Sequence, residues 1–423
     1  MKKTLILFCA ILMIAYSNAK AQLVMEVDSS LVYINGEGTF INVGKGEGTK
    51  FNFLTAIQPG IQSNRLNSES TLTNSNRMSL NLVRLSITAT TFKNKVSLGL
   101  LTDFTGDSPL LEGWIGFAMN KNIKFILGQR QTNTNNRLAM ADERYAQVMG
   151  QSIAGKSNDG IIYGGLMQNF VGSTREGGVF LETNFNLNKM RIYPSLSVTT
   201  GEGQNFFSSQ TNEGFKYGGR LDILPFGDFI KNNSFIAHDI YREPKPKVAL
   251  GVAASYNSKA SSPIGSDNSI ITNIYNKKGT ADFANYRKLV ADFVFKSKGF
   301  ALVGEYIVSS VTGKDLYTNS ASTNKLTEQE ASSYYNLGSG INLQTSYIFK
   351  NGWAIDTRYA NVIPEFDTTN SIVHKQTWLT FGVNKFIKNN AVKVGFTTSF
   401  IDDSTPTITT KKWINNFAIQ ILL

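Results

Sequence analysis

After residue 50, the sequence consists of short segments in which apolar side chains occupy every second position. A period of two is typical of a β-strand with two different faces. In a soluble sandwich the polar face of such a strand points outward, whereas in a transmembrane barrel the apolar face contacts lipid and the polar face encloses water. Short turns alternate with long polar loops between the segments. This pattern favours an all-β, transmembrane antiparallel β-barrel over a secreted soluble β-protein.

The first 21 residues have the pattern of a secretory signal peptide. Lys2 and Lys3 supply positive charge, Leu5–Tyr16 is apolar, and residues 19–21 form a small-x-small cleavage site. An apolar run of about 12 residues is too short for a membrane-spanning helix. We therefore predict that residues 1–21 are removed on export.

Composition excludes several classes of function. The one cysteine, Cys9, lies inside the signal peptide, so the mature chain would have neither disulfides nor cysteine-based metal sites. Cleavage removes three lysines and lowers the formal net charge from +11 to +8. An exported chain does not meet nucleic acid, so none is expected as a partner. No metal-ligand spacing is present, and we predict no metal and no cofactor.

Pairing the alternating segments gives about 16 strands, an even number that places both termini on the periplasmic side of a bacterial barrel. The first strand is Phe51–Gln58, the stretch Pro59–Arg77 is a loop, and Lys412–Leu422 closes the chain. Residues 51–423 are thus predicted to form the barrel, in the outer membrane of a Gram-negative bacterium. Residues 22–50 form a periplasmic N-terminal segment or an additional short strand.

Parity within each strand predicts which charged side chains face the barrel interior. A charge on the lipid face costs about 2–4 kcal/mol near the membrane centre, so charged strand residues are expected to point inward. The predicted pore-lining basic residues are Arg84, Lys124, Arg130, Arg191, Lys216, Arg220, Lys288, Arg358 and Lys393. The predicted inward acidic residues are Glu182, Asp222, Asp292, Glu305 and Asp356.

These charges have two interpretations. Arg220 and Asp222 share a face, as do Asp356 and Arg358, and such pairs can hold a wall together without setting selectivity. The surplus of basic over acidic residues would instead concentrate anions in a water-filled lumen, a mild preference that salt screens.

The region Asn133–Arg175 is too long for a plain loop. Its first part, Arg137–Gly150, has helix-forming composition, and Gly160–Gln168 is apolar and rich in glycine. We predict that this third loop folds into the barrel and narrows it, with Arg137, Arg144 and Lys156 at the constriction. The alternative is an extracellular cap.

Several stretches resemble a known family. Leu110–Gly155, with the turn "NKN-K" and the strand residues Gly128-Gln129-Arg130 before the long loop, looks like the corresponding part of the phosphate-selective porin O and P family. Further stretches that resemble it are Tyr193–Gly203, Tyr217–Asp228, Pro246–Tyr256 and Asp292–Tyr306. The resemblance implies a 16-stranded, typically trimeric outer-membrane porin with an inward third loop and basic residues along an anion path. Members carry charged residues where this chain has Gln131–Thr134 and Met149–Ser152. The resemblance therefore implies that this chain is a porin, but it is not a safe basis for phosphate selectivity.

Together these features predict a porin for passive diffusion of small solutes, with a mild preference for anions, phosphate included as an option. Its partners would be outer-membrane lipid, small anionic or neutral solutes and two further copies in a homotrimer. The alternative is a plugged barrel that acts as a docking or secretion component. An enzyme is not predicted, because the only histidines, His238 and His374, fall in a turn and a loop with no nucleophile motif.

Overall fold

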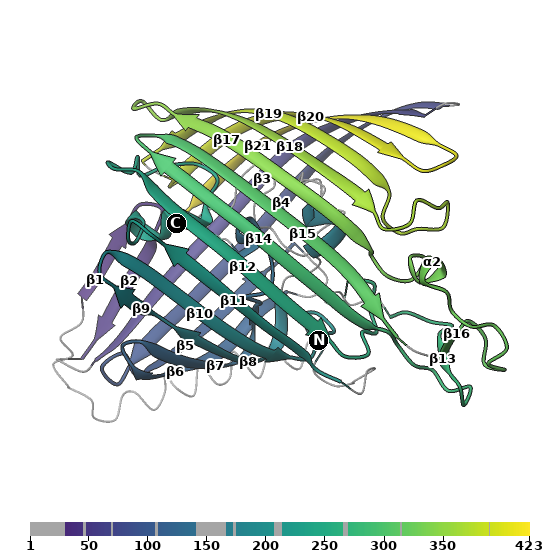
Figure 1. Ribbon diagram of the computed structural model, residues 1–423. Coiled ribbons are helices and arrows are strands. Elements are labelled where there is room, and N and C mark those ends of the chain that lie inside the picture. The colour runs from purple at the N-terminus through teal and green to yellow at the C-terminus, as the bar shows by residue number, and fades with distance from the viewer. Residues whose placement is uncertain are drawn as a thin grey trace, which may run out of the picture.

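A computed structural model describes residues 30–44, 48–68, 71–105, 109–140, 166–171, 175–206, 214–264, 270–313, 315–388 and 390–423 (Figure 1). Most of these residues are in strands. The strands are β1 Ser30–Ile34, β2 Gly38–Val43, β3 Thr49–Ser68, β4 Thr71–Thr91, β5 Val96–Asp103, β6 Leu110–Asn120, β7 Ile123–Gln131, β8 Arg175–Thr183, β9 Phe185–Leu187, β10 Met190–Thr199, β11 Lys216–Leu224, β12 Lys247–Asn257, β13 Tyr275–Asn276, β14 Asn285–Ser297, β15 Phe300–Thr312, β16 Leu316–Tyr317, β17 Gly338–Ile348, β18 Trp353–Pro364, β19 Lys375–Ile387, β20 Val392–Ser404 and β21 Thr409–Leu422. The helical elements are short: η1 Arg137–Met140, η3 Met167–Val171, η4 Ile230–Phe235 and α2 Glu328–Ala331.

The sheet closes into a 16-stranded antiparallel barrel, which confirms the predicted fold class. Each barrel strand pairs with its neighbour in sequence, and the last strand, β21, pairs with β3. β8 and β9 count as one barrel strand, because both pair with β10 and only Asn184 separates them. Closure leaves no open edge among the barrel strands, so their backbone N–H and C=O groups are paired within the sheet.

The two faces of the barrel wall differ as parity predicted. On β12, Leu250 and Val252 are 46% and 52% exposed, whereas Ala249 and Ala253, which flank them and point to the other face, are 0% and 3% exposed. The same alternation of exposed apolar and buried side chains runs through β19 and β21. The barrel therefore presents an apolar outer surface and encloses its polar side chains. No helix in the described part of the chain is long and apolar enough to cross a membrane.

The prediction of a loop at Pro59–Arg77 was wrong. β3 and β4 continue through it as a long hairpin, in which polar residues pair directly, for example Gln62 with Arg77. Apolar alternation is lost there because neither face needs to meet lipid, while the backbone ladder persists. Pro59 lacks an N–H for that ladder, and the register shifts between Gln58 and Pro59.

Before the barrel, the described part of segment 22–50 contains two strands. β1 pairs with β2, and β2 pairs with the first residues of β3, which extend beyond the end of β21. Glu37, in the β1–β2 turn, forms an ion pair with Lys231 in η4. The C-terminus lies at this end of the barrel, and α2, β13 and β16 lie at the other (Figure 1).

The long connections β12–β14 and β15–β17 fold together at that other end. Their apolar side chains form a buried cluster that includes Ile274, Leu316 and Tyr335. The Tyr335 hydroxyl accepts a hydrogen bond from the Ala284 N–H at 2.9 Å and donates one to the Ala260 carbonyl at 3.0 Å. Burial raises the pKa of Tyr335, so its hydroxyl stays protonated and can donate. These connections thus have a core of their own, which their polar composition did not predict.

We predict that Tyr335→Ala loosens these two connections and leaves the barrel intact. Removing a fully buried aromatic ring costs about 3–5 kcal/mol, and both hydrogen bonds go with it. Limited proteolysis should cut the β12–β14 and β15–β17 connections faster, while thermal unfolding of the barrel is unchanged. The matched control is Tyr33→Ala, because Tyr33 is 47% exposed at the opposite end. Equal proteolysis of both variants would contradict a packed core.

Candidate functional site

The start of the β7–β8 connection, Thr132–Met140, contacts side chains on the inner face of the barrel wall. Arg137 is fully buried, its Nε donates to Asp292 on β14 at 2.9 Å, and its terminal nitrogen contacts Asp222 on β11. The backbone N–H of Leu138 donates to Glu305 on β15 at 2.8 Å. This segment therefore spans from β11 to β15 inside the barrel.

Arg137 is part of a cluster of four charges. Arg220 on β11 donates through Nε to Asp222 and through its terminal nitrogen to Asp292, each at 2.8 Å. Two arginines and two aspartates thus share their hydrogen bonds within a buried site. Because a buried charge without a partner is costly, each member of the cluster requires the others.

Apolar packing holds the same segment against one part of the wall. The inner faces of β12, β14 and β15 carry small or aliphatic residues as well as charged ones, among them Ala249, Val294 and Val303. Leu138 packs on these residues. Phe170, in η3, packs on Val290, Ile307 and their neighbours further along the same strands.

A second segment, Asp228–Glu243 between β11 and β12, lies against the inner face from the opposite end. Lys296 on β14 is fully buried and donates to the His238 carbonyl at 2.7 Å. The His238 ring contacts Asp356 on β18, and Asp239 accepts from the Gly299 N–H at 2.8 Å. Asp239 is thus engaged with backbone and not with the neighbouring histidine. These contacts fix the segment in place.

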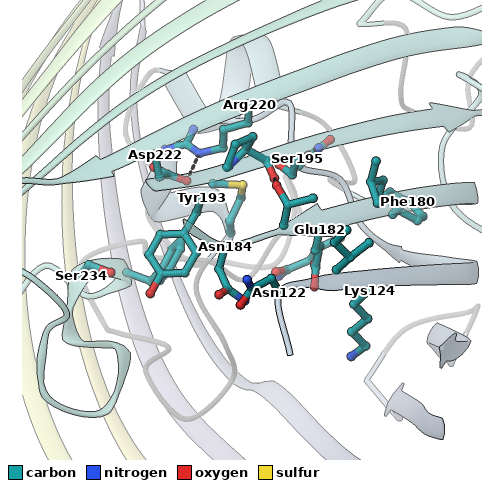
Figure 2. A pocket seen from close by; sticks show the side chains of 18 of the residues that line it. Asn122, Lys124, Phe180, Glu182, Asn184, Tyr193, Ser195, Arg220, Asp222 and Ser234 are labelled. Atoms are coloured by element: carbon teal, nitrogen blue, oxygen red, sulfur yellow. Dashed lines mark hydrogen bonds and ion pairs between the residues drawn. The ribbon is translucent and has the colours of Figure 1, made fainter. Parts of the chain in front are cut away.

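A cavity of about 720 Å³ lies between these two segments and the wall formed by β6 to β11. Figure 2 shows Lys124, Glu182 and the Arg220–Asp222 pair around it, with the polar side chains of Asn122 and Ser195. The turn residues Asn94, Asn120 and Lys121 also line the cavity. It therefore reaches the end of the barrel that carries the short turns.

Most predicted basic residues have an acidic partner. The pairs are Arg84 with Asp103, Arg130 with Glu182, Arg191 with Asp228, Lys216 with Glu176, and Arg220 with Asp222 and Asp292, at 2.7–3.0 Å. Four of the predicted acidic residues, Asp222, Asp292, Glu305 and Asp356, are buried. Five of the nine predicted basic residues are thus compensated by a carboxylate.

The remaining predicted basic residues differ in environment. Lys288 donates to the Asn135 side chain at 2.7 Å, and Arg358 and Lys393 are 2% and 0% exposed. Lys124 is half-buried, with its ammonium 5.1 Å from the centre of the Trp114 ring. Of the predicted constriction residues, Arg137 is described above, and Arg144 and Lys156 lie outside the described residues.

Parity did not identify four carboxylates that pair with inner basic residues. They are Asp103, Glu112, Glu176 and Asp228, with Glu112 accepting from Arg175 at 3.1 Å. Each lies within the first or last three residues of a strand or beyond its end, where the alternation that guides parity is weakest. The count of nine basic against five acidic residues therefore overstated the positive charge that is free of partners.

The described ranges hold no group of three or more His, Cys, Asp or Glu side chains placed to bind a metal ion. Among the charged residues that line the cavity, Arg130 and Glu182 bind each other, Arg220 binds Asp222 and Asp292, and Asp228 binds Arg191. Lys124 also lines the cavity and can donate to an anion.

No protein-family model and no curated protein matches the chain. Several solved structures match the chain in fold. An anion-selective porin from Comamonas acidovorans matches with a TM-score of 0.54 and 10% identity, over 89% of this chain and 100% of that one. The outer membrane channel DcaP of Acinetobacter baumannii matches with a TM-score of 0.53 and 10% identity, over 89% and 97%. OprB of Pseudomonas putida matches with a TM-score of 0.50 and 10% identity, over 88% and 94%.

At this level of identity the comparisons show the fold. The chain has the closed 16-stranded barrel of bacterial outer-membrane porins. Membership of the phosphate-selective O and P family stays a prediction.

We predict that Arg137→Met detaches Thr132–Met140 from the wall. The substitution leaves Asp222 and Asp292 with Arg220 alone, and breaking a buried ion pair costs about 3–5 kcal/mol. Backbone hydrogen exchange in residues 132–140 should accelerate by roughly 100-fold or more, with the barrel strands unchanged. Arg65→Met, on the exposed end of the β3–β4 hairpin, is the control. Unchanged exchange in Arg137→Met would show that apolar packing alone holds the segment.

Proposed function

We propose that the protein is an outer-membrane porin, a water-filled channel through which small solutes diffuse passively, with a mild preference for anions. The observation that carries this proposal is the closed barrel with an exposed apolar outer face and a polar, charged inner face. Such a surface is stable only where lipid surrounds the barrel and water fills it. The likeness in fold to outer-membrane porins supports the same reading.

The cavity beside β6–β11 is the best candidate for part of the solute path. Five basic and three acidic residues line it, namely Lys121, Lys124, Arg130, Arg137 and Arg220 against Glu182, Asp222 and Asp228. A modest positive excess in a confined space attracts anions by about one kT, and salt screens this effect. A mild anion preference follows.

Strong phosphate selectivity is not part of this proposal. Each arginine that lines the cavity already donates a hydrogen bond to a carboxylate. The segment Gln131–Thr134, which would stand near a constriction, carries only neutral side chains. A phosphate dianion needs several available donors, and few are free to serve it.

We further propose that the β7–β8 connection narrows the channel. Its first residues contact β11, β14 and β15 from inside, and Arg137 lies at the point where the cavity meets that segment. We propose the same narrowing role for the rest of the predicted third loop, including Arg144 and Lys156.

Location and assembly complete the proposal. Residues 1–21 would direct export, residues 22–50 would lie on the periplasmic side with β1 and β2, and the mature barrel would form a homotrimer in outer-membrane lipid, as the family resemblance implies. We propose no enzymatic activity and no cofactor.

The first test is the zero-current potential of the refolded protein in a planar bilayer under a tenfold KCl gradient. We expect channels that favour chloride over potassium by about sevenfold, because a potential of one kT enriches the anion and depletes the cation by about 2.7-fold each, and little block by phosphate. Strong block at low phosphate would restore the phosphate-selective function. Absence of channels in a correctly folded preparation would favour a plugged docking or secretion barrel.

The second test is the single-channel conductance of Arg137→Met. If the β7–β8 connection narrows the path, releasing Thr132–Met140 should raise the conductance and lower the preference for chloride, since a wider lumen holds more screening ions. Arg65→Met should conduct like the wild type. An unchanged conductance together with accelerated exchange in residues 132–140 would place the constriction elsewhere.

A further inference from the structure

Lys124 differs from the arginines that line the cavity. Arg130, Arg137 and Arg220 each lie within 3.0 Å of a carboxylate. Among the described residues, no carboxylate lies within 4.0 Å of the Lys124 ammonium, which lies over the face of Trp114 at 5.1 Å from the ring centre. It is therefore the cation of the inner wall most available to a solute.

The reason is a competition for Glu182. Lys124 and Glu182 are direct partners in the β7–β8 register, and such a pair would ordinarily neutralise itself. Instead, Glu182 accepts a hydrogen bond from Arg130 at 2.7 Å. The guanidinium of Arg130 lies 5.4 Å from the centre of the Phe180 ring and 5.8 Å from that of Trp114. Contacts with these two rings hold the Arg130 guanidinium in a position where it, and not Lys124, forms the ion pair with Glu182.

Two glycines make room for this arrangement. A Cβ on Gly99 would lie 2.4 Å from the Trp114 ring, and a Cβ on Gly116 would lie 2.7 Å from Cε of Lys124. The ring and the lysine stem thus occupy space that any other residue at these positions would fill. Glycine at these two positions therefore allows the Trp114 ring and the Lys124 stem to lie close against the wall.

The surroundings define the kind of ligand. The neighbouring lining is rich in neutral polar groups, including Asn122, Thr183 and Asn184. One ammonium group can bind one carboxylate, and the neutral polar groups beside it can form hydrogen bonds with the rest of a polar organic molecule. A phosphate dianion would need a second cation beside Lys124. Of the other cations that line the cavity, Arg130, Arg137 and Arg220 are paired with carboxylates, and Lys121 lies in the exposed β6–β7 turn. A cavity of 720 Å³ is within the size range of sites for small organic molecules.

We propose that the cavity binds small polar organic anions that carry a single carboxylate, that Lys124 binds the carboxylate, and that Arg130 keeps Lys124 available by holding Glu182. This inference rests on the proposed channel function and names its preferred class of solute. Arg130 acts here as a positioning residue.

Binding can be measured without any channel current. Trp114 lies against Lys124, so its fluorescence should report occupancy in detergent-solubilised, folded protein, with a Trp114→Phe variant giving the background from the other tryptophans. We expect gluconate, a monocarboxylate, to bind at roughly three- to tenfold lower concentration than inorganic phosphate at equal ionic strength. Equal affinities, or tighter binding of phosphate, would overturn the proposal.

Variants separate the roles of the three charges. Lys124→Gln should weaken gluconate binding by about three- to tenfold, and Glu182→Gln should strengthen it, because the carboxylate that competes for the site is gone. Arg130→Gln should weaken binding as Lys124→Gln does, since Glu182 is then free to neutralise Lys124, and the double variant Arg130→Gln/Glu182→Gln should recover it. Failure of the double variant to recover binding would refute the positioning role.

Lys350→Gln is the matched control, because Lys350 is exposed in a turn at the same end of the barrel and does not line the cavity. It should bind gluconate like the wild type. Gluconate should also block planar-bilayer currents in the same rank order across the variants. Fluorescence binding without channels would contradict the porin proposal alone, whereas channels without gluconate binding would contradict only the carboxylate site.

Discussion

The pairing of β21 with β3 is the constraint on which the rest of the structure depends. It joins the last strand to the first barrel strand over most of the length of β21 and turns an open sheet into a wall with an inside and an outside. Backbone groups are then satisfied within the sheet, so the outer face can be apolar throughout. The charged side chains that remain are confined to the interior, where each needs a partner or water.

Because the charged side chains are confined to the interior, most of them pair with groups of opposite charge or with backbone carbonyls. Arg137 brings the β7–β8 connection to Asp222 and Asp292, and Lys296 binds carbonyl groups of the β11–β12 segment. In both cases a charge on or near the wall holds a chain segment inside the barrel, in addition to the apolar packing of that segment on the wall. Lys124 is the exception. One carboxylate, Glu182, lies within reach of both Lys124 and Arg130, and it forms its ion pair with Arg130.

Much of this could be predicted from the sequence, and the failures have physical causes. Period-two alternation identified the barrel and its closing strand, since each strand face meets one solvent. It failed at Pro59–Arg77, where the hairpin continues with polar residues on both faces. Parity found Lys124, Arg130 and Glu182, but the choice of Glu182 between two cations depends on where Trp114 and Phe180 place the guanidinium. No spacing rule contains that information.

A signal for the inner arrangement was nevertheless present in three strands that have apolar residues at some inward positions. Along β12, β14 and β15, these positions include Ala249, Ala253, Val290 and Val303, next to charged inward residues such as Asp292 and Glu305. An apolar inward patch must be covered, as the lipid-facing side is. Leu138 and Phe170 provide that cover, so the inserted segments lie against this part of the wall. The open space is consequently displaced toward β6–β11, where the inner face is polar and where the cavity and Lys124 are found.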